Sequence, residues 1–225
     1  MRTKALLCAA GLLAVGAVSS MAQSNVYSLN VVGYINVSLT NGFNLIANQM
    51  DLDGNLTNNT VTGVFSTNLP SGSKVYAYST ASGYSIATFN GTAWGPAGAL
   101  PGANAGLTPG RGVWVSIPGT TGNGITLTEV GNVVQGTHAV PVIAGFQIAS
   151  IIPPLSAKIS TDMAYAATLG DKVFQYRNPT GYQIRSYNGT AWGPPALGEP
   201  TPGVGEAFWL QAAAGKTWTQ TFNVQ

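Results

Sequence analysis

The sequence predicts an all-β protein built from two tandem, related antiparallel units, each sandwich-like or barrel-like, with little helix. Three observations support this prediction. The segment "FNGTAWGP" at 89–96 recurs as "YNGTAWGP" at 187–194, which indicates an internal duplication. In both copies Asn-Gly lies between residues of high strand propensity, and this is the strongest short-range signal for a β-hairpin. Helix signals are scarce, and the best candidate is the segment 160–170.

The first 22 residues have the layout of a secretory signal peptide. Arg2 and Lys4 form a basic start, an apolar run extends from Ala5 to Val18, and Ser20–Ala22 is a small-x-small ending. The apolar run is shorter than the roughly 20 residues that a membrane span needs. We therefore expect cleavage after Ala22, a secreted or outer-cell-surface location, and no membrane span in the mature chain.

The predicted mature chain carries almost no charge. Removal of Arg2 and Lys4 leaves equal numbers of basic and acidic residues, so the formal charge of +2 belongs to the leader. A neutral surface does not attract nucleic acid or anionic membranes. It also lacks the charge repulsion that keeps proteins apart, which favours self-association or attachment to an extracellular matrix. The single cysteine, Cys8, leaves with the leader, so no disulfide framework is expected.

The duplication extends over most of the mature chain. Segment 74–97 aligns with 172–195 without a gap, and segment 33–48 aligns with 136–151. Further along, "PGRGVWV" resembles "GVGEAFWL", with one glycine of each loop aligned. A period of about 95–100 residues corresponds to a whole small domain rather than to one step of a solenoid.

Two domains follow from this alignment. We expect a first β unit over 23–135 and a second over 136–225, packed as a pseudo-twofold pair because each alone is small for a stable core. The stretch "NVVG" at 30–33 repeats the motif that closes each unit, so the first unit gains an extra strand at its start. That strand pairs with its own unit in the favoured interpretation, and with a neighbouring molecule in the alternative.

Within each unit the chain alternates short strands and turns. Val75–Tyr78 and Tyr84–Phe89 are predicted strands joined by "STASG". The next four residues, Phe89–Thr92, predict a type I′ turn, which needs positive φ at both central positions. Trp94 then lies on the returning strand, which Gly-Pro ends because proline cannot donate to a sheet ladder. The second copy repeats this pattern around 187–194.

Helix is expected only in short pieces. The segment "STDMAYAATLG" at 160–170 begins with capping residues and ends at Gly170, so it predicts one or two helical turns. Its counterpart in the first unit, "TGVFSTNLPSG" at 62–72, predicts a poorer helix.

The aromatic residues suggest a carbohydrate-binding module as the alternative function. Exposed Trp and Tyr faces stack on sugar rings, and amide side chains add directional hydrogen bonds. Trp114 and Trp209 lie in apolar runs and are expected to be buried, and hairpin tryptophans commonly pack across their own strands instead. The candidate ligand-binding residues belong to the repeated hairpins: Trp94, Trp192, Tyr84, Tyr182, Asn90 and Asn188.

Metal binding and catalysis have little support. Asp51, Asp53 and Asn55 place oxygen atoms at alternating positions, as calcium loops do. Gly54 is out of place for such a loop and the second copy lacks these acids, so a polar surface turn is favoured. The mature chain has one histidine and no cysteine, and no acidic residue recurs in both copies. We therefore expect no cofactor, no metal and no enzymatic activity.

Several segments of the first copy resemble a loose group of short secreted bacterial proteins with a GYxNVxLxxGFNLIAN opening and a PGxGxWV strand. They are "NVVGYINVSLTNGFNLIANQM" (30–50), "GNLTNNTVTGVF" (54–65), "KVYAY" and "LTPGRGVWV" (107–115). The second copy resembles the group more faintly. The resemblance carries over no catalytic or binding residues. It implies release or non-covalent retention, since some members end in a sorting tail that does not follow Gln225. We expect a secreted or cell-envelope, non-enzymatic structural or interaction protein that can self-associate.

Overall fold

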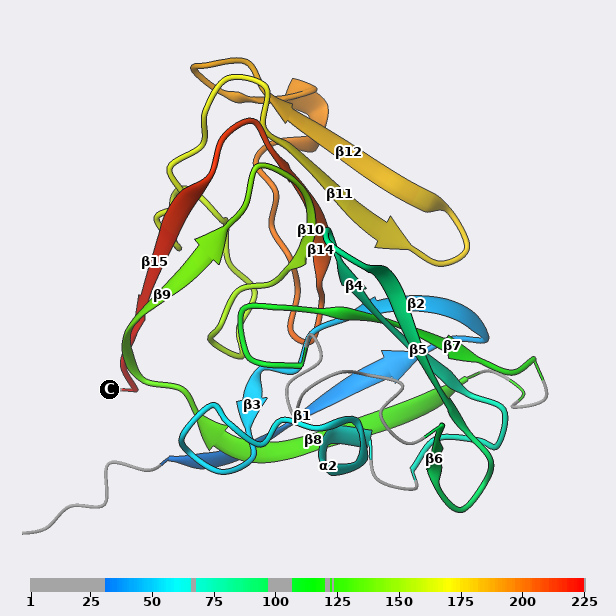
Figure 1. Cartoon of the computed structure of the whole chain (residues 1–225). Coiled ribbons are helices and arrows are strands. Elements are labelled where there is room, and N and C mark those ends of the chain that lie inside the picture. The colour runs from blue at the N-terminus through cyan, green and yellow to red at the C-terminus, as the bar shows by residue number, and fades with distance from the viewer. Residues whose placement is uncertain (1–30, 66–67, 97–106, 120–121, 123, 225) are drawn as a thin grey trace, which may run out of the picture.

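The computed structural model describes residues 31–65, 68–96, 107–119, 122 and 124–224. It confirms a mostly β protein whose antiparallel sheets are grouped into two halves (Figure 1). The described strands do not close into a barrel. The predicted signal peptide lies outside the described residues.

The first half consists of a three-stranded sheet in the order β1-β8-β3 and a five-stranded sheet in the order β2-β7-β4-β5-β6. The strands of the smaller sheet are β1 (Val32–Leu39), β8 (Ile125–Val133) and β3 (Met50–Asp51). Those of the larger sheet are β2 (Gly42–Ile46), β7 (Val113–Ile117), β4 (Lys74–Ser79), β5 (Gly83–Phe89) and β6 (Trp94–Gly95). One short helix, α2 (Val61–Phe65), packs its buried side chains into the core of this half.

The second half repeats this plan. Its larger sheet has the order β10-β14-β11-β12-β13, which matches the first half strand for strand, and its smaller sheet is the pair β15-β9. The strands are β9 (Gly136–Val142), β10 (Gly145–Ala149), β11 (Lys172–Arg177), β12 (Gly181–Tyr187), β13 (Trp192–Gly193), β14 (Phe208–Ala212) and β15 (Lys216–Phe222), with a single 3-10 turn, η2 (Pro195–Leu197). The two copies predicted from the sequence therefore share the same strand order in their larger sheets.

Each half buries its core between its two sheets. In the first half, Leu39 and Leu127 of the smaller sheet pack against Val75 and Val115 of the larger one. In the second half, Trp218 fills the equivalent space and is 1% exposed. Because side chains alternate along a strand, the opposite face of each larger sheet is left to point outward. That outward face forms the candidate site.

The two halves meet through contacts that occur in equivalent pairs. The amide of Ala47 donates to the carbonyl of Gly205 (2.9 Å), and the amide of Ser150 donates to the carbonyl of Gly110 (3.1 Å). Ala47 and Ser150 are aligned positions of the two copies, and so are Gly110 and Gly205. The halves are thus related by an approximate twofold axis, as the duplication predicts.

The first strand of the described chain pairs within its own half. β1 runs antiparallel to β8 over its whole length, from Val32 opposite Asn132 to Leu39 opposite Ile125. Its counterpart β9 pairs with β15 in the same way. This is the favoured one of the two pairings predicted for the start of the chain.

The prediction of a type I′ turn at Asn-Gly is wrong, although the hairpin itself is present. Phe89 pairs with Trp94, so four residues rather than two form the loop. Of the described residues other than glycine, only Leu56 and Ala164 have positive φ, so Asn90 does not. Its side chain instead accepts hydrogen bonds from within the loop, which favours the longer turn.

The predicted helix at 160–170 is also absent. The backbone amide of Thr161 donates to the Glu199 carboxylate (2.9 Å), as does that of Ser160, and the Thr161 hydroxyl donates to it as well (2.6 Å). Ala164 adopts φ 54°, which interrupts helical backbone, and Tyr165 is buried in the core of the second half. Tertiary contacts thus override the local capping signal, while the weaker helix prediction at 62–72 overlaps α2.

Candidate functional site

The outward faces of the two larger sheets are aromatic. Along β4, Val75 and Ala77 are buried in the core of the first half, while Tyr76 and Tyr78 alternate with them on the other face. The neighbouring strand β5 adds Tyr84 to the same face. The second half repeats this alternation along β11 and β12.

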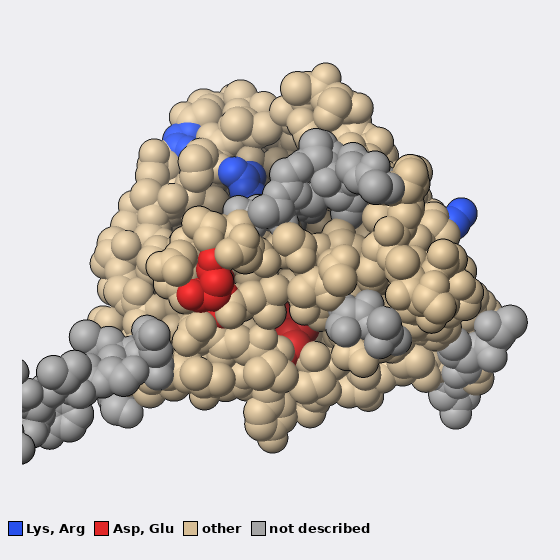
Figure 2. Space-filling model, turned by 60° about the horizontal axis from the view of Figure 1, so that its bottom comes forward, with Lys and Arg blue, Asp and Glu red and all other residues tan. Residues whose placement is uncertain are grey.

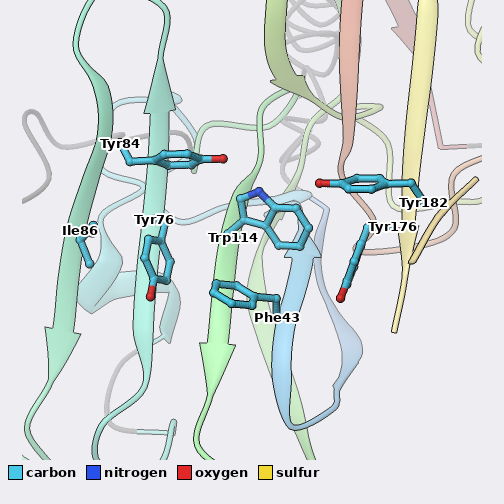
Figure 3. A pocket seen from close by; sticks show the side chains of 7 residues that line it. All are labelled: Phe43, Tyr76, Tyr84, Ile86, Trp114, Tyr176 and Tyr182. Carbon is cyan, nitrogen blue, oxygen red and sulfur yellow. The ribbon is translucent and has the colours of Figure 1, made fainter. Parts of the chain in front are cut away.

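These two faces converge on a groove between the halves, which we call the aromatic groove. It has a volume of about 440 Å³. Figure 3 shows its lining, which is drawn from both halves: Phe43, Tyr76, Tyr84, Ile86, Trp114, Tyr176 and Tyr182. No charged side chain is among these lining residues.

Ring contacts across the twofold axis fix the walls of the groove. The rings of Trp114 and Tyr176 meet edge to face with centroids 4.9 Å apart, and those of Tyr78 and Trp209 do the same at 4.8 Å. These are equivalent contacts in the two halves. Trp114 is buried as predicted, at 8% exposure, whereas Trp209 is only half-buried.

Tyr84 and Tyr182 are the most accessible tyrosines of the groove, and Phe43 is equally exposed at 47%. The two tyrosines are 48% and 47% exposed, and Figure 3 shows their hydroxyls pointing toward one another across Trp114. Burial raises the pKa of both hydroxyls, against opposing hydrogen bonds from the side chains of Trp114 and Trp209 respectively. Both phenols are therefore protonated at neutral pH and can donate to a ligand.

Charged side chains are sparse in this protein, at 7% of its residues. Figure 2 shows one face of the molecule, on which lysine, arginine and acidic side chains are few and scattered. The described residues form two ion pairs within the chain, one between Arg177 and Glu206 and one between Lys216 and Asp171. The groove therefore favours a ligand that presents apolar ring faces and neutral hydrogen-bonding groups.

Two of the six predicted ligand residues, Tyr84 and Tyr182, lie together in the groove, and the two tryptophans lie elsewhere. Trp192 is 8% exposed, packs against Tyr165 and Tyr187, and donates its indole N–H to the Ser160 hydroxyl (3.0 Å). Trp94 is half-buried against the core of the first half. The structure therefore places both tryptophans in packing positions.

Asn90 and Asn188 each stabilise the hairpin loop in which they lie. The side-chain oxygen of Asn90 accepts from the amide and hydroxyl of Thr92 (both 2.9 Å) and from the amide of Ala93 (2.8 Å). Asn188 makes the same three hydrogen bonds in the second copy. The repeated motif thus preserves a loop geometry.

The weak calcium candidates form a hydrogen-bonded loop. Asp51 is buried and accepts from the amide of Leu56 (3.0 Å), while Asp53 accepts from the amide of Asn55 (2.9 Å). A hydrogen bond from the side chain of Thr57 is the main cause that lowers the pKa of Asp53 to about 2. Among the described residues, no group of three or more His, Cys, Asp or Glu side chains is arranged to hold a metal.

Five lining residues were not predicted from the sequence as ligand contacts: Phe43, Tyr76, Ile86, Trp114 and Tyr176. Strand alternation signals the outward direction of the two tyrosines, because each lies next to buried residues of β4 or β11. The convergence of the two faces depends on the packing of the halves, which the sequence pattern does not show.

Comparisons with known proteins give no relative for this fold. No family model, no curated protein and no solved structure matches the chain. Within the described part of the chain, no helix is both long and apolar enough to span a membrane.

Proposed function

We propose that this protein is a secreted, non-enzymatic binding protein that holds a carbohydrate in the aromatic groove between its halves. The observation that carries the proposal is the set of accessible aromatic ring faces that both halves contribute to one cavity. Pyranose rings present C–H faces that stack on tyrosine and tryptophan. Their hydroxyl groups pair with the few polar atoms that orient a ligand in such sites.

The dimensions and chemistry of the groove support a sugar rather than a strongly ionic ligand. Its volume of about 440 Å³ falls within the range of roughly 300–1,000 Å³ that is common for small-ligand sites. The polar atoms of its lining are the hydroxyls of the tyrosines and the indole N–H of Trp114. A stretch of neutral polysaccharide matches both the ring faces and these donors.

The test is retention of the purified protein by a panel of soluble and insoluble neutral polysaccharides. We expect at least one to be retained, and we expect Tyr84→Ala and Tyr182→Ala each to weaken that retention at least tenfold. Because both rings are about half exposed, neither substitution should unfold the protein. The thermal midpoint Tm of each variant checks this.

Tyr34→Ala is the matched control. Tyr34 is 68% exposed on β1 and is not among the residues that line the groove, so its loss should leave retention unchanged. Absence of retention on every polysaccharide, together with concentration-dependent oligomers in light scattering, would instead support a self-associating structural protein.

A further inference from the structure

A second pocket, which we call the arginine pocket, lies near the aromatic groove and is linked to it by a ring contact. It has a volume of about 240 Å³, and its lining includes Arg111, Gln147, Ser79, Thr80 and Tyr78. The ring of Tyr78 contacts that of Tyr84 with centroids 5.3 Å apart, and Tyr84 lines the aromatic groove. The two pockets share no lining residue, so a ligand must be long enough to pass this ring pair in order to contact both, as a polysaccharide chain is.

Arg111 has no acidic partner in the described part of the chain. Its guanidinium donates to the side-chain oxygen of Gln147 (3.2 Å) and to the carbonyl of Pro141 (3.0 Å), both of which are neutral. A guanidinium has five N–H donors, so three remain for a ligand. No other charged side chain lines the pocket among the described residues.

At the twofold-related position in the second half, the charged side chain has a counter-charge within the chain. Glu206 occupies the place of Arg111 in the second half, as the paired bridges of Ile46 with Glu206 and of Arg111 with Ala149 show. Glu206 forms an ion pair with Arg177 and accepts from the side chain of Gln175 (2.8 Å). The second half thus neutralises its charge within the chain, whereas the first half leaves its positive charge uncompensated.

A half-buried cation without a counter-charge is unfavourable, because it loses hydration and gains no ion pair. Burial lowers the pKa of Arg111, and no neighbouring charge in the described residues offsets this. The guanidinium nevertheless stays charged at any physiological pH. An anionic group supplied by a ligand would remove this imbalance.

The geometry points to the arginine pocket as a subsite for a singly charged oxyanion on the bound carbohydrate, either a uronate carboxylate or a sulfate ester. A single guanidinium balances one negative charge, so these groups match the pocket better than a phosphate dianion. The planar fork of Arg111 also suits bidentate pairing with two oxygens. This inference rests on the proposed carbohydrate binding in the nearby groove.

The test compares polymers that differ only in charge. Polygalacturonate is set against its fully methyl-esterified form, and κ-carrageenan against its chemically desulfated form, in affinity electrophoresis at low salt. We expect at least a tenfold preference for the acidic member of one pair, and which pair shows it distinguishes carboxylate from sulfate. Arg111→Gln should abolish the preference while leaving retention of the neutral member within twofold.

Two further variants complete the design. Arg111→Lys keeps the positive charge but lacks the planar guanidinium, so it should retain only part of the preference for the acidic polymer. Partial retention would show that the loss in Arg111→Gln comes from the missing charge and not from unfolding. Lys158→Gln removes the same charge from an exposed position outside the pocket and should retain the full preference.

The outcomes separate the two proposals. A protein that retains neutral polymers through Tyr84 and Tyr182 but prefers neither acidic member would overturn the arginine subsite alone. The same conclusion follows if Arg111→Gln keeps the preference. Retention that is insensitive to the two tyrosines, or no retention of any polymer, would overturn carbohydrate binding in the groove and the subsite with it.

Discussion

Glu129 in β8 and Gln220 in β15 occupy the same position in the two halves, and each is only 2% exposed. Gln220 is satisfied there, because its side-chain oxygen accepts from the amide of Ile152 (2.9 Å) and its N–H group lies 3.5 Å from the carbonyl of Ser150. Neither carboxylate oxygen of Glu129 has a hydrogen-bond partner of ordinary geometry in the described chain. The first half therefore buries an acid where the second half buries an amide.

This difference predicts that Glu129→Gln stabilises the protein at neutral pH. Burial raises the pKa of Glu129 to about 8, and the backbone amide of Gln49 opposes this only weakly. Since the folded pKa is above the unfolded one, the neutral carboxyl favours the fold fully below about pH 4.5, and this contribution is lost as the pH rises toward 8. We expect a gain on the order of 3 kcal/mol in the free energy of unfolding at pH 7.

Urea unfolding at pH 5 and at pH 8 measures this effect. The gain from Glu129→Gln should be larger at the higher pH, because the unfolded acid is fully ionised there while the folded one still holds its proton up to a pKa of about 8. Gln220→Glu is the mirror control and should destabilise the protein more at pH 8 than at pH 5. Equal pH dependence in the wild type and in Glu129→Gln would contradict the prediction.

The second half in turn contains a buried ion pair that the first half lacks. Asp171 is fully buried and lies 2.7 Å from the Lys216 ammonium, measured from carboxylate oxygen to nitrogen. The equivalent positions in the first half are Ser73 and Ile125. The two halves therefore differ at both members of the pair together.

We expect Asp171→Asn to destabilise the protein by about 3–5 kcal/mol, because it leaves Lys216 partly buried without its counter-charge. The double variant Asp171→Ser, Lys216→Ile, which copies the first half, should lose less than the sum of its single changes. Thermal and urea unfolding of the wild type, Asp171→Ser, Lys216→Ile and the double variant gives the coupling energy between the two positions. Additive losses would show that the two positions are not coupled.

The ion pair between Asp171 and Lys216 also predicts how the stability of the protein falls at acid pH. Burial alone would raise the pKa of Asp171, but Lys216, the backbone amides of Ala213 and Thr168, and the Tyr165 hydroxyl together lower it. A lowered folded pKa stabilises the fold above the ordinary value of 3.8 and stops doing so as the pH falls through the folded value. Asp171→Asn should therefore flatten the loss of stability in acid, which unfolding between pH 5 and pH 2 measures.

The parts of the fold that depend on local pattern were predictable. The repeated Asn-Gly between β-formers locates both hairpins, and the alternation along "KVYAY" separates core residues from outward tyrosines. The turn type was not predictable, because the Asn90 side chain satisfies a four-residue loop that competes with type I′ geometry. The segment 160–170 fails as a helix for a similar reason, since Glu199 binds its first amides from a distant part of the chain.

The candidate site was only partly predictable because it lies between the two copies. Tyr84 and Tyr182 stand out in the sequence as paired aromatic residues of the repeat. Their proximity to Trp114 follows from the twofold packing of the halves, which no periodicity within one copy encodes. Arg111 carries no sequence signal at all, because the alignment places an acid at the equivalent position.

A fourth prediction concerns the twofold axis, where the two halves leave room for one methyl group. A Cβ added at Gly112 would lie 2.2 Å from the Cβ of Ala207, its counterpart, and 2.8 Å from the carbonyl of Ile46. Gly112→Ala should therefore destabilise the protein by about 1–3 kcal/mol through overpacking. Adding Ala207→Gly should recover part of this loss, because it removes the closer contact. Urea unfolding should therefore rank the double variant between the wild type and Gly112→Ala in free energy of unfolding.

The tryptophans of the repeated motif give a final prediction that separates packing from binding. Trp192→Ala should lower the free energy of unfolding by about 3–5 kcal/mol, because it empties a site between Tyr165 and Tyr187 and removes the hydrogen bond to Ser160. Trp94→Ala should cost less, because Trp94 is only half-buried.

Both tryptophan variants should keep the polysaccharide retention of the wild type when measured well below their Tm. This is the opposite of what Tyr84→Ala and Tyr182→Ala should do, since those tyrosines are exposed in the groove. Loss of retention in Trp94→Ala or Trp192→Ala at unchanged Tm would move the binding surface from the groove to the hairpins. The repeated motif would then be a ligand site rather than a device that fixes one loop in each half.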